Sequence, residues 1–437
     1  MPWSRSVLRF PPRRQIFLAS RPFRYRHGRF WIEGVPWEGV VESLGTPVLI
    51  YSRERLLSNI ASLEKTAKAL PIPVRIHAAL KACTLPGIAT ILREAGLGVE
   101  VMSEFEYQLS RKAGFTPGQM VVNAPAKARA FLDRAVAEKV ALLNVESEDE
   151  LEVIDALGRR IGAPVRIGVR VNPPLGREPP RAFGGRGSKF GFDIDSGDAR
   201  RAVKLAASLP GVELMAIHCH AWTRQYAPRR YLAGVRPVLR FLAEVEREID
   251  RRIPWIDLGG GFGSRNLLEA SGRRIADFLG PLGEEIRGLG GHRELLLEPG
   301  RYLLNDAAVC IGQVLARKRN ARRHWVLTDA GSHILPLRDN VEYYAAPAQL
   351  NRGSQRFCIG DALCIPSGVL PGSFALGEIR SGDSLVIFNC GAYTFSLAQH
   401  FGGLAPAVAL VEGDTWRLLF RRRSPDEWLR WIEDQRL

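Results

Sequence analysis

Cysteine and long apolar runs are scarce in this chain of 437 residues. It has six cysteines, none in a Cys-x-x-Cys pair, which indicates reduced thiols in a cytoplasmic protein. No apolar run is long enough for a membrane helix, and no solenoid-type repeat recurs. Glycine and proline are frequent but not periodic, which excludes collagen-like and low-complexity chains. What remains is a large globular protein, and its 46% hydrophobic content suffices for two domains.

Acidic residues are missing from the first thirty positions, although the chain as a whole carries a net charge of +15. The same segment, Met1–Phe30, holds Arg5, Arg9, Arg13, Arg14, Arg21, Arg24, Arg26 and Arg29. We interpret it as a basic surface arm; an organelle transit peptide is the alternative. No nucleic-acid recognition motif accompanies the charge, so we expect no nucleic-acid partner and no membrane partner. A basic surface would attract an acidic protein.

Strand-like and helical stretches alternate through the middle of the chain. The strand-like runs are Val74–Leu80, Gly98–Met102, Met120–Val122, Ala141–Val145, Val165–Val171, Leu214–Cys219, Trp255–Leu258 and Glu294–Leu297. Amphipathic stretches such as Glu148–Ile161 lie between them. This order predicts an α/β fold, a TIM-type (β/α)₈ barrel over residues 46–303.

The pattern changes after about Tyr302. Strand-like runs separated by Gly, Asp and Pro turns follow, namely Val309–Val314, Trp325–Thr328, Arg356–Ile359, Ser384–Phe388 and Trp416–Phe420. We therefore expect a mostly β domain over residues 304–437. The arm over residues 1–45 is expected to contribute to that domain.

Polar residues stand where the barrel strands are expected to end. They are Lys81, Ser103, Asn123, Glu146, Arg170 with Asn172, His220, Gly259–Gly261, and Glu298 with Arg301. Chemistry in such barrels lies at the C-terminal strand ends, so these residues should face one pocket. Lys81 is the most informative, because a desolvated lysine is a good nucleophile toward an aldehyde cofactor.

Two further segments supply parts for such a cofactor. Asp257-Leu258-Gly259-Gly260-Gly261-Phe262-Gly263 would let backbone N–H groups approach a phosphate, although glycine clusters are equally often plain turns. In Glu298-Pro299-Gly300-Arg301, the carboxylate could keep a pyridine nitrogen protonated and the arginine could bind a phosphate or carboxylate.

The segment His218-Cys219-His220 raises the question of a metal. Zinc would need further ligands, and none stands at suitable spacing, so we predict no metal site. We interpret His218 as a core residue and His220 as a ring stacked on the cofactor.

As a set, these segments resemble the fold-type III pyridoxal-phosphate enzymes, the diaminopimelate, ornithine and arginine decarboxylases with an alanine-racemase-type barrel. The motifs that carry the resemblance are Ala79-Leu80-Lys81-Ala82, Val101-Met102-Ser103-Glu104-Phe105-Glu106, Asn144-Val145-Glu146-Ser147, Ser188-Lys189-Phe190-Gly191, His218-Cys219-His220, the glycine segment, Glu298-Pro299-Gly300-Arg301 and Gly391-Ala392-Tyr393. The resemblance runs from Gly45-Thr46-Pro47 to Phe401-Gly402-Gly403.

The resemblance implies pyridoxal 5'-phosphate as cofactor and a role for each matching position. Lys81 would form the Schiff base, His220 would stack on the ring, and Glu298 would pair with the ring nitrogen. The other implied cofactor contacts are Thr223, Gly260, Gly261, Gly300, Arg301 and Tyr393. The resemblance also implies a homodimer with shared active sites, in which Cys364 of one subunit helps to protonate the carbanion in the other.

The departures from the family fall on substrate recognition. An acid usually follows the cysteine, and Gly368 stands there; an arginine usually follows the Asp-Ala-Gly motif, and Arg338 is displaced. Trp222 adds bulk beside Thr223, where small residues are usual. We therefore predict decarboxylation of an amino acid other than diaminopimelate or ornithine, either free or tethered to a carrier protein.

Two alternatives stay open. An amino-acid racemase or epimerase could use the same fold, although racemases of this type place an arginine where Glu298 stands. A non-catalytic regulatory homologue could keep the barrel, although it would have no need for Lys81, Glu298 and Cys364.

Overall fold

The computed structural model describes residues 22–175, 187–336 and 342–434. The chain forms two compact units. The barrel unit comprises Ile60–Leu268 and Gly272–Tyr302. The β-rich unit comprises the described residues up to Asn59, Glu269–Ser271 and those from Leu303 onward. The predicted domain boundaries stay a prediction, and the arginines of the arm up to Arg21, like Arg338, lie outside the described residues.

The barrel unit confirms the predicted parallel barrel. Its strands follow the order β9-β11-β12-β13-β5-β6-β7-β8, and β8 pairs with β9 to close the ring. Each predicted run forms one of them: β5 (Val74–Ala79), β6 (Gly98–Val101), β7 (Met120–Asn123), β8 (Leu142–Val145), β9 (Val165–Asn172), β11 (Val212–His218), β12 (Trp255–Asp257) and β13 (Glu294–Leu297). A short strand, β10 (Phe192–Asp193), adds to β9.

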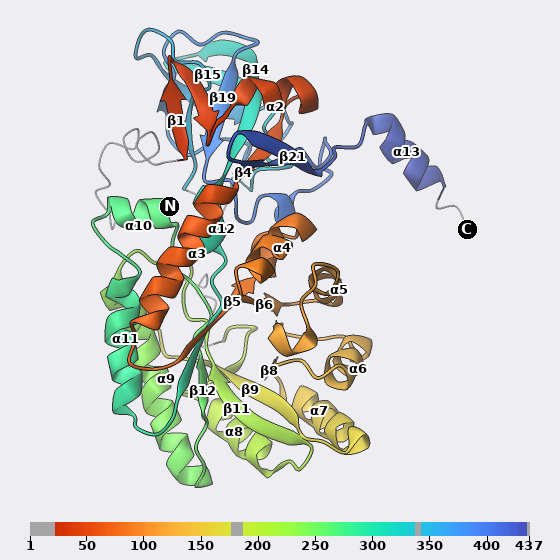
Figure 1. The fold of residues 1–437 in the computed structure, drawn as a ribbon, viewed down its shortest axis with the longest axis vertical. Coiled ribbons are helices and arrows are strands. Elements are labelled where there is room, and N and C mark those ends of the chain that lie inside the picture. The colour runs from red at the N-terminus through yellow and green to blue at the C-terminus, as the bar shows by residue number, and fades with distance from the viewer. Residues whose placement is uncertain (1–21, 176–186, 337–341, 435–437) are drawn as a thin grey trace. The chain divides into compact units, whose positions relative to one another are not determined.

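Helices follow the strands and surround them (Figure 1). They are α4 (Pro86–Glu94), α5 (Glu104–Lys112), α6 (Arg129–Ala137), α7 (Glu148–Ile161), α8 (Asp198–Ser208), α9 (Pro228–Ile249), α10 (Arg265–Ala270) and α11 (Ala276–Gly288). Serine caps start α5 and α7. In α5 the Ser103 hydroxyl accepts from the Glu106 N–H at 3.2 Å, and the Glu106 carboxylate accepts from the Met102 N–H at 2.9 Å. Ser103, one of the predicted pocket residues, is therefore a helix cap.

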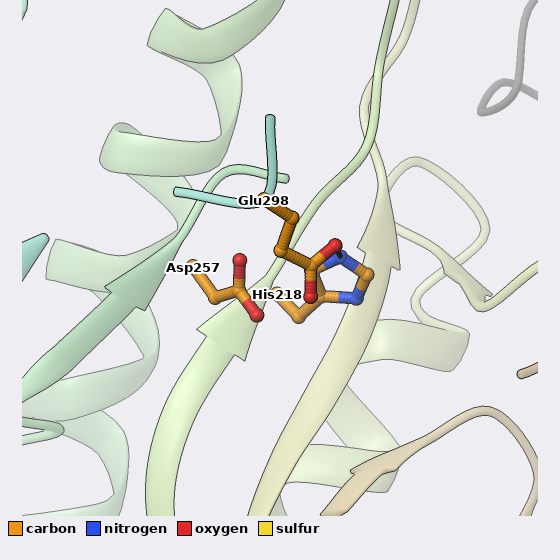
Figure 2. A group of neighbouring side chains, drawn as sticks. All are labelled: His218, Asp257 and Glu298. Carbon is orange, nitrogen blue, oxygen red and sulfur yellow. Dashed lines mark ion pairs between the residues drawn. The ribbon is translucent and has the colours of Figure 1, made fainter. Parts of the chain in front are cut away.

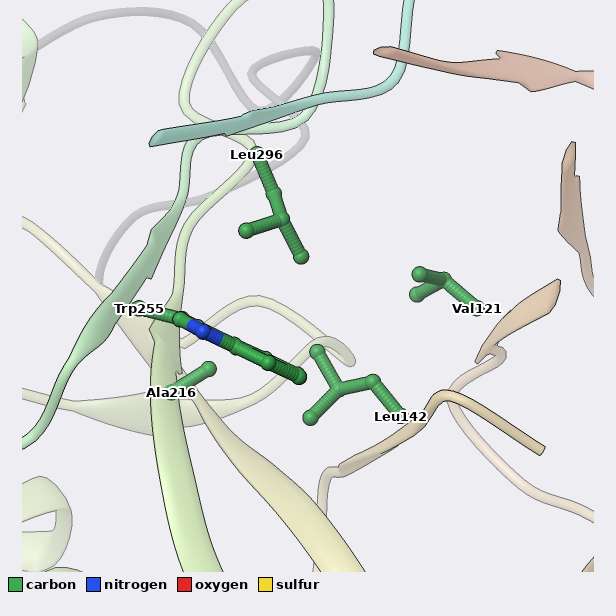
Figure 3. Packing of buried hydrophobic residues seen from close by; sticks show 5 residues of the cluster. All are labelled: Val121, Leu142, Ala216, Trp255 and Leu296. Atoms are coloured by element: carbon green, nitrogen blue, oxygen red, sulfur yellow. The ribbon is translucent and has the colours of Figure 1, made fainter. Parts of the chain in front are cut away.

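The barrel interior is packed with apolar side chains. Val121, Leu142, Ala216, Trp255 and Leu296 come from five different strands and form one buried cluster (Figure 3). Figure 3 shows the Trp255 indole reaching across the barrel beside Ala216 toward Leu142. Because side chains fill this layer, polar groups that enter the barrel gather at the strand ends.

The β-rich unit confirms the predicted second domain. Its main sheet has the order β18-β17-β15-β14-β4-β20-β21, and β19 joins β14 to β16. The strands are β4 (Val48–Ser52), β14 (Ala308–Asn320), β15 (Arg323–Thr328), β16 (Tyr344–Pro347), β17 (Arg356–Asp361), β18 (Phe374–Ala375), β19 (Ser384–Phe388), β20 (Ala407–Glu412) and β21 (Thr415–Phe420). β4 lies between β14 and β20, so N-terminal sequence completes a sheet built mostly from C-terminal sequence.

Short elements complete both units. They are β1 (Phe23–Arg26), β2 (Arg29–Ile32) and β3 (Val35–Pro36), which form a small antiparallel sheet, and the helices α2 (Trp37–Leu44), α3 (Arg53–Lys68), α12 (Arg301–Leu304) and α13 (Pro425–Glu433). Among the described residues, no helix is long and apolar enough to cross a membrane.

Candidate active site

Lys81 lies directly after β5, in a single 3₁₀ turn (Leu80–Ala82) at the C-terminal end of the strand. Its Nζ donates a hydrogen bond to Oε2 of Glu100, a fully buried residue of β6. The lysine side chain is 28% exposed, so its amine remains accessible while it neutralises the buried carboxylate. Sequence reasoning missed Glu100, although an acid within the apolar run Gly98-Val99-Glu100-Val101 was a signal for it.

A buried carboxyl pair lies at the ends of the neighbouring strands β12 and β13. Asp257, Glu298 and His218 bring their polar atoms within 4.8 Å of one another (Figure 2). Asp257 accepts hydrogen bonds from Nδ2 of Asn144 at 2.9 Å and from the N–H of Gly259 at 3.0 Å. Burial raises the pKa of Asp257 to about 6. Burial and the negative charge of Asp257 raise the pKa of Glu298 well above its usual range.

These shifts favour protonation of Glu298, whose pKa is raised more strongly than that of Asp257. Nδ2 of Asn123, at the end of β7, lies 3.2 Å from Oε2 of Glu298 and holds that carboxyl group in place. The pair can therefore keep a proton in a water-poor site at neutral pH.

His218 is fully buried, as expected of a core residue, but its surroundings are polar. Its Nε2 lies 3.3 Å from Nδ2 of Asn123 and 3.8 Å from Oε2 of Glu298. Burial and the positive charge of Arg170 lower the pKa of His218. The imidazole ring is therefore neutral, and it lies beside the carboxyl group of Glu298.

His220 follows β11 and contacts the glycine segment. Its Nδ1 accepts a hydrogen bond from the N–H of Gly260 at 3.3 Å. Burial, with smaller contributions from Arg170 and Lys81, lowers the pKa of His220 to about 3. A neutral imidazole held in one orientation is suited to stacking on a flat ring.

The glycine segment forms a tight backbone cradle. A Cβ atom on Gly259 would lie 2.4 Å from the His220 ring. On Gly260 it would lie 2.5 Å from the Glu298 carbonyl, and on Gly261 it would lie 2.4 Å from the Trp222 carbonyl. Gly259 and Gly261 also have φ angles of +60° and +88°, which favour glycine. Only glycine fits here, and the bare backbone fits a phosphate group.

The remaining predicted residues fall in both units. In the barrel unit, Gly300 is buried, and Thr223 and Arg301 are partly exposed. In the β-rich unit, Cys364 carries an exposed thiol in the loop after β17, and Tyr393 is partly exposed with a φ of +58°. Such a backbone conformation is strained for a tyrosine and is typical of functional positions.

The barrel unit gathers most of the predicted set. The charge of Lys81 acts on both His220 and Glu298, so the three residues share one site, and the glycine cradle borders it. Sequence reasoning named these residues but missed Asp257 and Asn144, which support Glu298 from behind. A polar residue in the middle or at the end of a barrel strand was the signal for both.

The bulk that Trp222 was predicted to add beside Thr223 is mostly buried. The indole is 8% exposed and packs against α9. Its ring lies close to Gly234 of that helix.

Comparison with known proteins agrees with this geometry. A family model described as "Pyridoxal-dependent decarboxylase, pyridoxal binding domain" matches residues 57–305. The chain is 29% identical to diaminopimelate decarboxylase of Aquifex aeolicus over 92% of this chain and 95% of the relative. It is 27% identical to that of Haemophilus influenzae over 93% and 97%.

The fold agrees with that of a solved relative. The structure of diaminopimelate decarboxylase from M. jannaschii in complex with L-lysine covers 96% of this chain and 99% of its own, with a TM-score of 0.83 and 24% identity. The matched family binds pyridoxal phosphate, and the glycine cradle and the buried carboxyl pair fit that group. The chain belongs to the pyridoxal-dependent decarboxylases.

Proposed function

We propose that this protein removes the α-carboxylate of an amino acid with pyridoxal phosphate bound at the C-terminal end of the barrel. The observation that carries the proposal is the grouping of one accessible lysine amine, a proton-holding carboxyl pair and a glycine cradle at adjoining strand ends. A regulatory protein would need none of the three. A racemase is less consistent with Glu298, because a carboxyl at this position favours full protonation of the ring.

Each residue of the site has a definable task. When bound, the cofactor supplies an aldehyde for the substrate amine and a ring that accepts the electrons left by carbon dioxide. Lys81 would hold the aldehyde carbon, and His220 would cover one face of the ring. The Glu298 carboxylate would pair with the protonated ring nitrogen and so keep the proton there. In the barrel unit the phosphate would lie among Thr223, Gly260, Gly261, Gly300 and Arg301, and the contact from Tyr393 stays a prediction from the family resemblance.

The final proton transfer to Cα would come from Cys364. Its thiol is exposed in the part of the chain that the structure describes, as a proton donor to a substrate must be. We propose, from the family resemblance, that it acts on the site of the second subunit of a homodimer. The dimer, like the cytoplasmic location, stays a prediction.

The substrate is proposed to differ from diaminopimelate, on which the relatives named above act. Gly368 stands where the family usually has an acid in the loop after Cys364. A Cβ atom on Gly368 would lie 2.2 Å from Oδ1 of Asp361. Asp361 is fixed, since it accepts hydrogen bonds from the N–H groups of Ser332 at 2.8 Å and Leu363 at 3.2 Å. The backbone here therefore has no room for an acidic side chain, which supports a substrate without a distal ammonium group.

A carrier-tethered substrate is favoured by a separate observation. The hairpin of β14 and β15 carries Arg317, Lys318, Arg319, Arg322 and Arg323, and within the described residues none of them forms an ion pair. Other exposed arginines do, as Arg200 does with Glu244 and Glu248. An unpaired basic hairpin supports docking of an acidic carrier protein.

The test is release of carbon dioxide and amine from free amino acids, meso-diaminopimelate and the same amino acids loaded on an acidic carrier protein. Lys81→Ala should abolish release while keeping the native circular dichroism spectrum. A double change, Lys318→Glu with Arg319→Glu, should slow only the carrier-linked substrate, mainly through the association rate. Efficient release from meso-diaminopimelate would show that the substrate proposal is wrong, and racemised amino acid without carbon dioxide would refute decarboxylation.

A further inference from the structure

Trp222 inserts its indole into a gap on the surface of α9. Gly234 forms that gap: a Cβ on this residue would lie 2.2 Å from Nε1 of Trp222 and 2.8 Å from its Cε2. The guanidinium of Arg230, one turn earlier on the same helix, lies 4.9 Å from the centre of the indole. Within the described residues Nε1 has no hydrogen-bond partner, so the contact depends on shape and on the cation.

The segment that carries Trp222 is joined to the glycine cradle by its backbone. The N–H of Gln225 donates to the carbonyl of Gly261 at 2.8 Å, and the N–H of Gly263 donates to the carbonyl of Gln225 at 3.0 Å. The carbonyl of Trp222 itself occupies the space that a Gly261 side chain would need. Movement of Trp222 would therefore move the cradle.

The backbone of this segment is also strained. Arg224 has a φ of +52°, which a residue with a side chain adopts only where its surroundings impose it. Backbone pairing with the cradle restrains the segment on one side. The indole in α9 restrains it on the other.

We infer that Trp222, seated against Gly234, is a positioning residue that fixes the phosphate cradle from outside the cofactor site. The inference rests on the proposed assignment of the glycine segment as the phosphate site. Trp222 does not touch the reacting atoms. Its role is to hold the 220–226 segment so that the backbone of Gly260 and Gly261 is in place before the cofactor arrives, which lowers the ordering cost of binding.

Gly234→Ala tests this inference, because it adds one methyl group where the indole lies. In the interior of a helix this change is ordinarily stabilising. Here it should displace Trp222 and weaken pyridoxal-phosphate binding to the apoprotein by roughly tenfold, as expected for overpacking by one methyl group. The matched control is Gly280→Ala in α11, where an added Cβ meets nothing within 4 Å and affinity should stay within about twofold of native.

A second change restores the fit. Trp222→Phe combined with Gly234→Ala should return the affinity to within about threefold of native, because the smaller ring leaves room for the methyl group. Native affinity in Gly234→Ala alone, or no recovery in the double variant, would overturn the inference. Both variants should keep the native kcat when saturated with cofactor, since the reacting groups are unchanged.

Pyridoxal without the phosphate separates this inference from the function on which it rests. A positioned phosphate cradle predicts that Gly234→Ala weakens pyridoxal phosphate much more than pyridoxal. Equal weakening of both would overturn the inference, because the segment would then not bind the phosphate. Failure of the native protein to bind pyridoxal phosphate at all would instead refute the proposed function.

Discussion

The buried ion pair between Arg170 and Glu146 is expected to contribute strongly to the stability of the barrel. Nη1 of Arg170 lies 2.6 Å from Oε1 of Glu146, and the two side chains are 5% and 1% exposed. The second carboxylate oxygen of Glu146 accepts from the N–H of Gly191 at 2.9 Å, and the guanidinium packs over Phe190 at 4.4 Å. Both charges are therefore removed from water and compensate each other.

Glu146→Gln keeps the size of the side chain and removes its charge. The guanidinium of Arg170 would lose the buried negative charge that Glu146 supplies, and the new amide would direct N–H groups toward it. Breaking a buried pair in this way costs about 3–5 kcal/mol of unfolding free energy. For a unit of this size, each kcal/mol shifts the melting temperature by about 2–4 °C. The expected fall is roughly 6–20 °C, measured by differential scanning calorimetry of the apoprotein.

The control is an exposed pair of the same type. Asp133 accepts from Arg160 at 2.8 Å, but the two side chains are 36% and 62% exposed. Asp133→Asn should therefore cost at most about 1 kcal/mol, or a few degrees. Equal melting temperatures for the two variants would refute the argument that burial makes the Arg170–Glu146 pair important.

Three further predictions concern groups near the cofactor end or inside the barrel. Burial lowers the pKa of His77 from 6.5 to about 4, so its contribution to stability is present above pH 6.5 and is lost as the pH falls toward 4. Between pH 7.5 and pH 4.5, the unfolding free energy of His77→Leu from urea titrations should fall by roughly 3 kcal/mol less than that of the native protein. An equal fall for the two proteins would contradict the prediction. Gly260→Ala should weaken pyridoxal-phosphate binding about tenfold or more in absorbance titrations, because its Cβ would lie 2.5 Å from the Glu298 carbonyl. Asp257→Asn should lower the pKa of Glu298 and make the absorbance of the bound cofactor titrate at lower pH; an unchanged midpoint would show that Asp257 does not act on Glu298.

Much of this molecule was predictable from local sequence. The apolar runs and the amphipathic stretches between them predicted all the barrel strands, because a parallel strand that is buried on both faces consists almost entirely of hydrophobic residues. The order of the strands then followed from the alternation with helices. Lys81, His220 and Glu298 could be placed at strand ends for the same reason, since each stands where an apolar run stops.

Where a role depends on a partner from another strand, the sequence marks the residue but does not show the partner. Glu100 pairs with Lys81, and Asp257 raises the pKa of Glu298, but each is simply an acid beside apolar residues in the sequence. The sequence did not show that the Ser103 hydroxyl caps α5. Burial and charge coupling are properties of the closed barrel, so they appear only once the strands are paired.

Side-chain direction was likewise decided by the tertiary structure. By position alone Trp222 follows His220 and belongs to the loop beside the cofactor site. Its indole packs against α9, the next helix of the chain, because Gly234 leaves a gap there that accepts it. The sequence by itself determined which strands form the barrel and which side chains reach its end, through hydrophobic period and chain order. Only the tertiary structure decided which of those side chains face the site, because facing depends on the shape and charge of residues that the fold brings together.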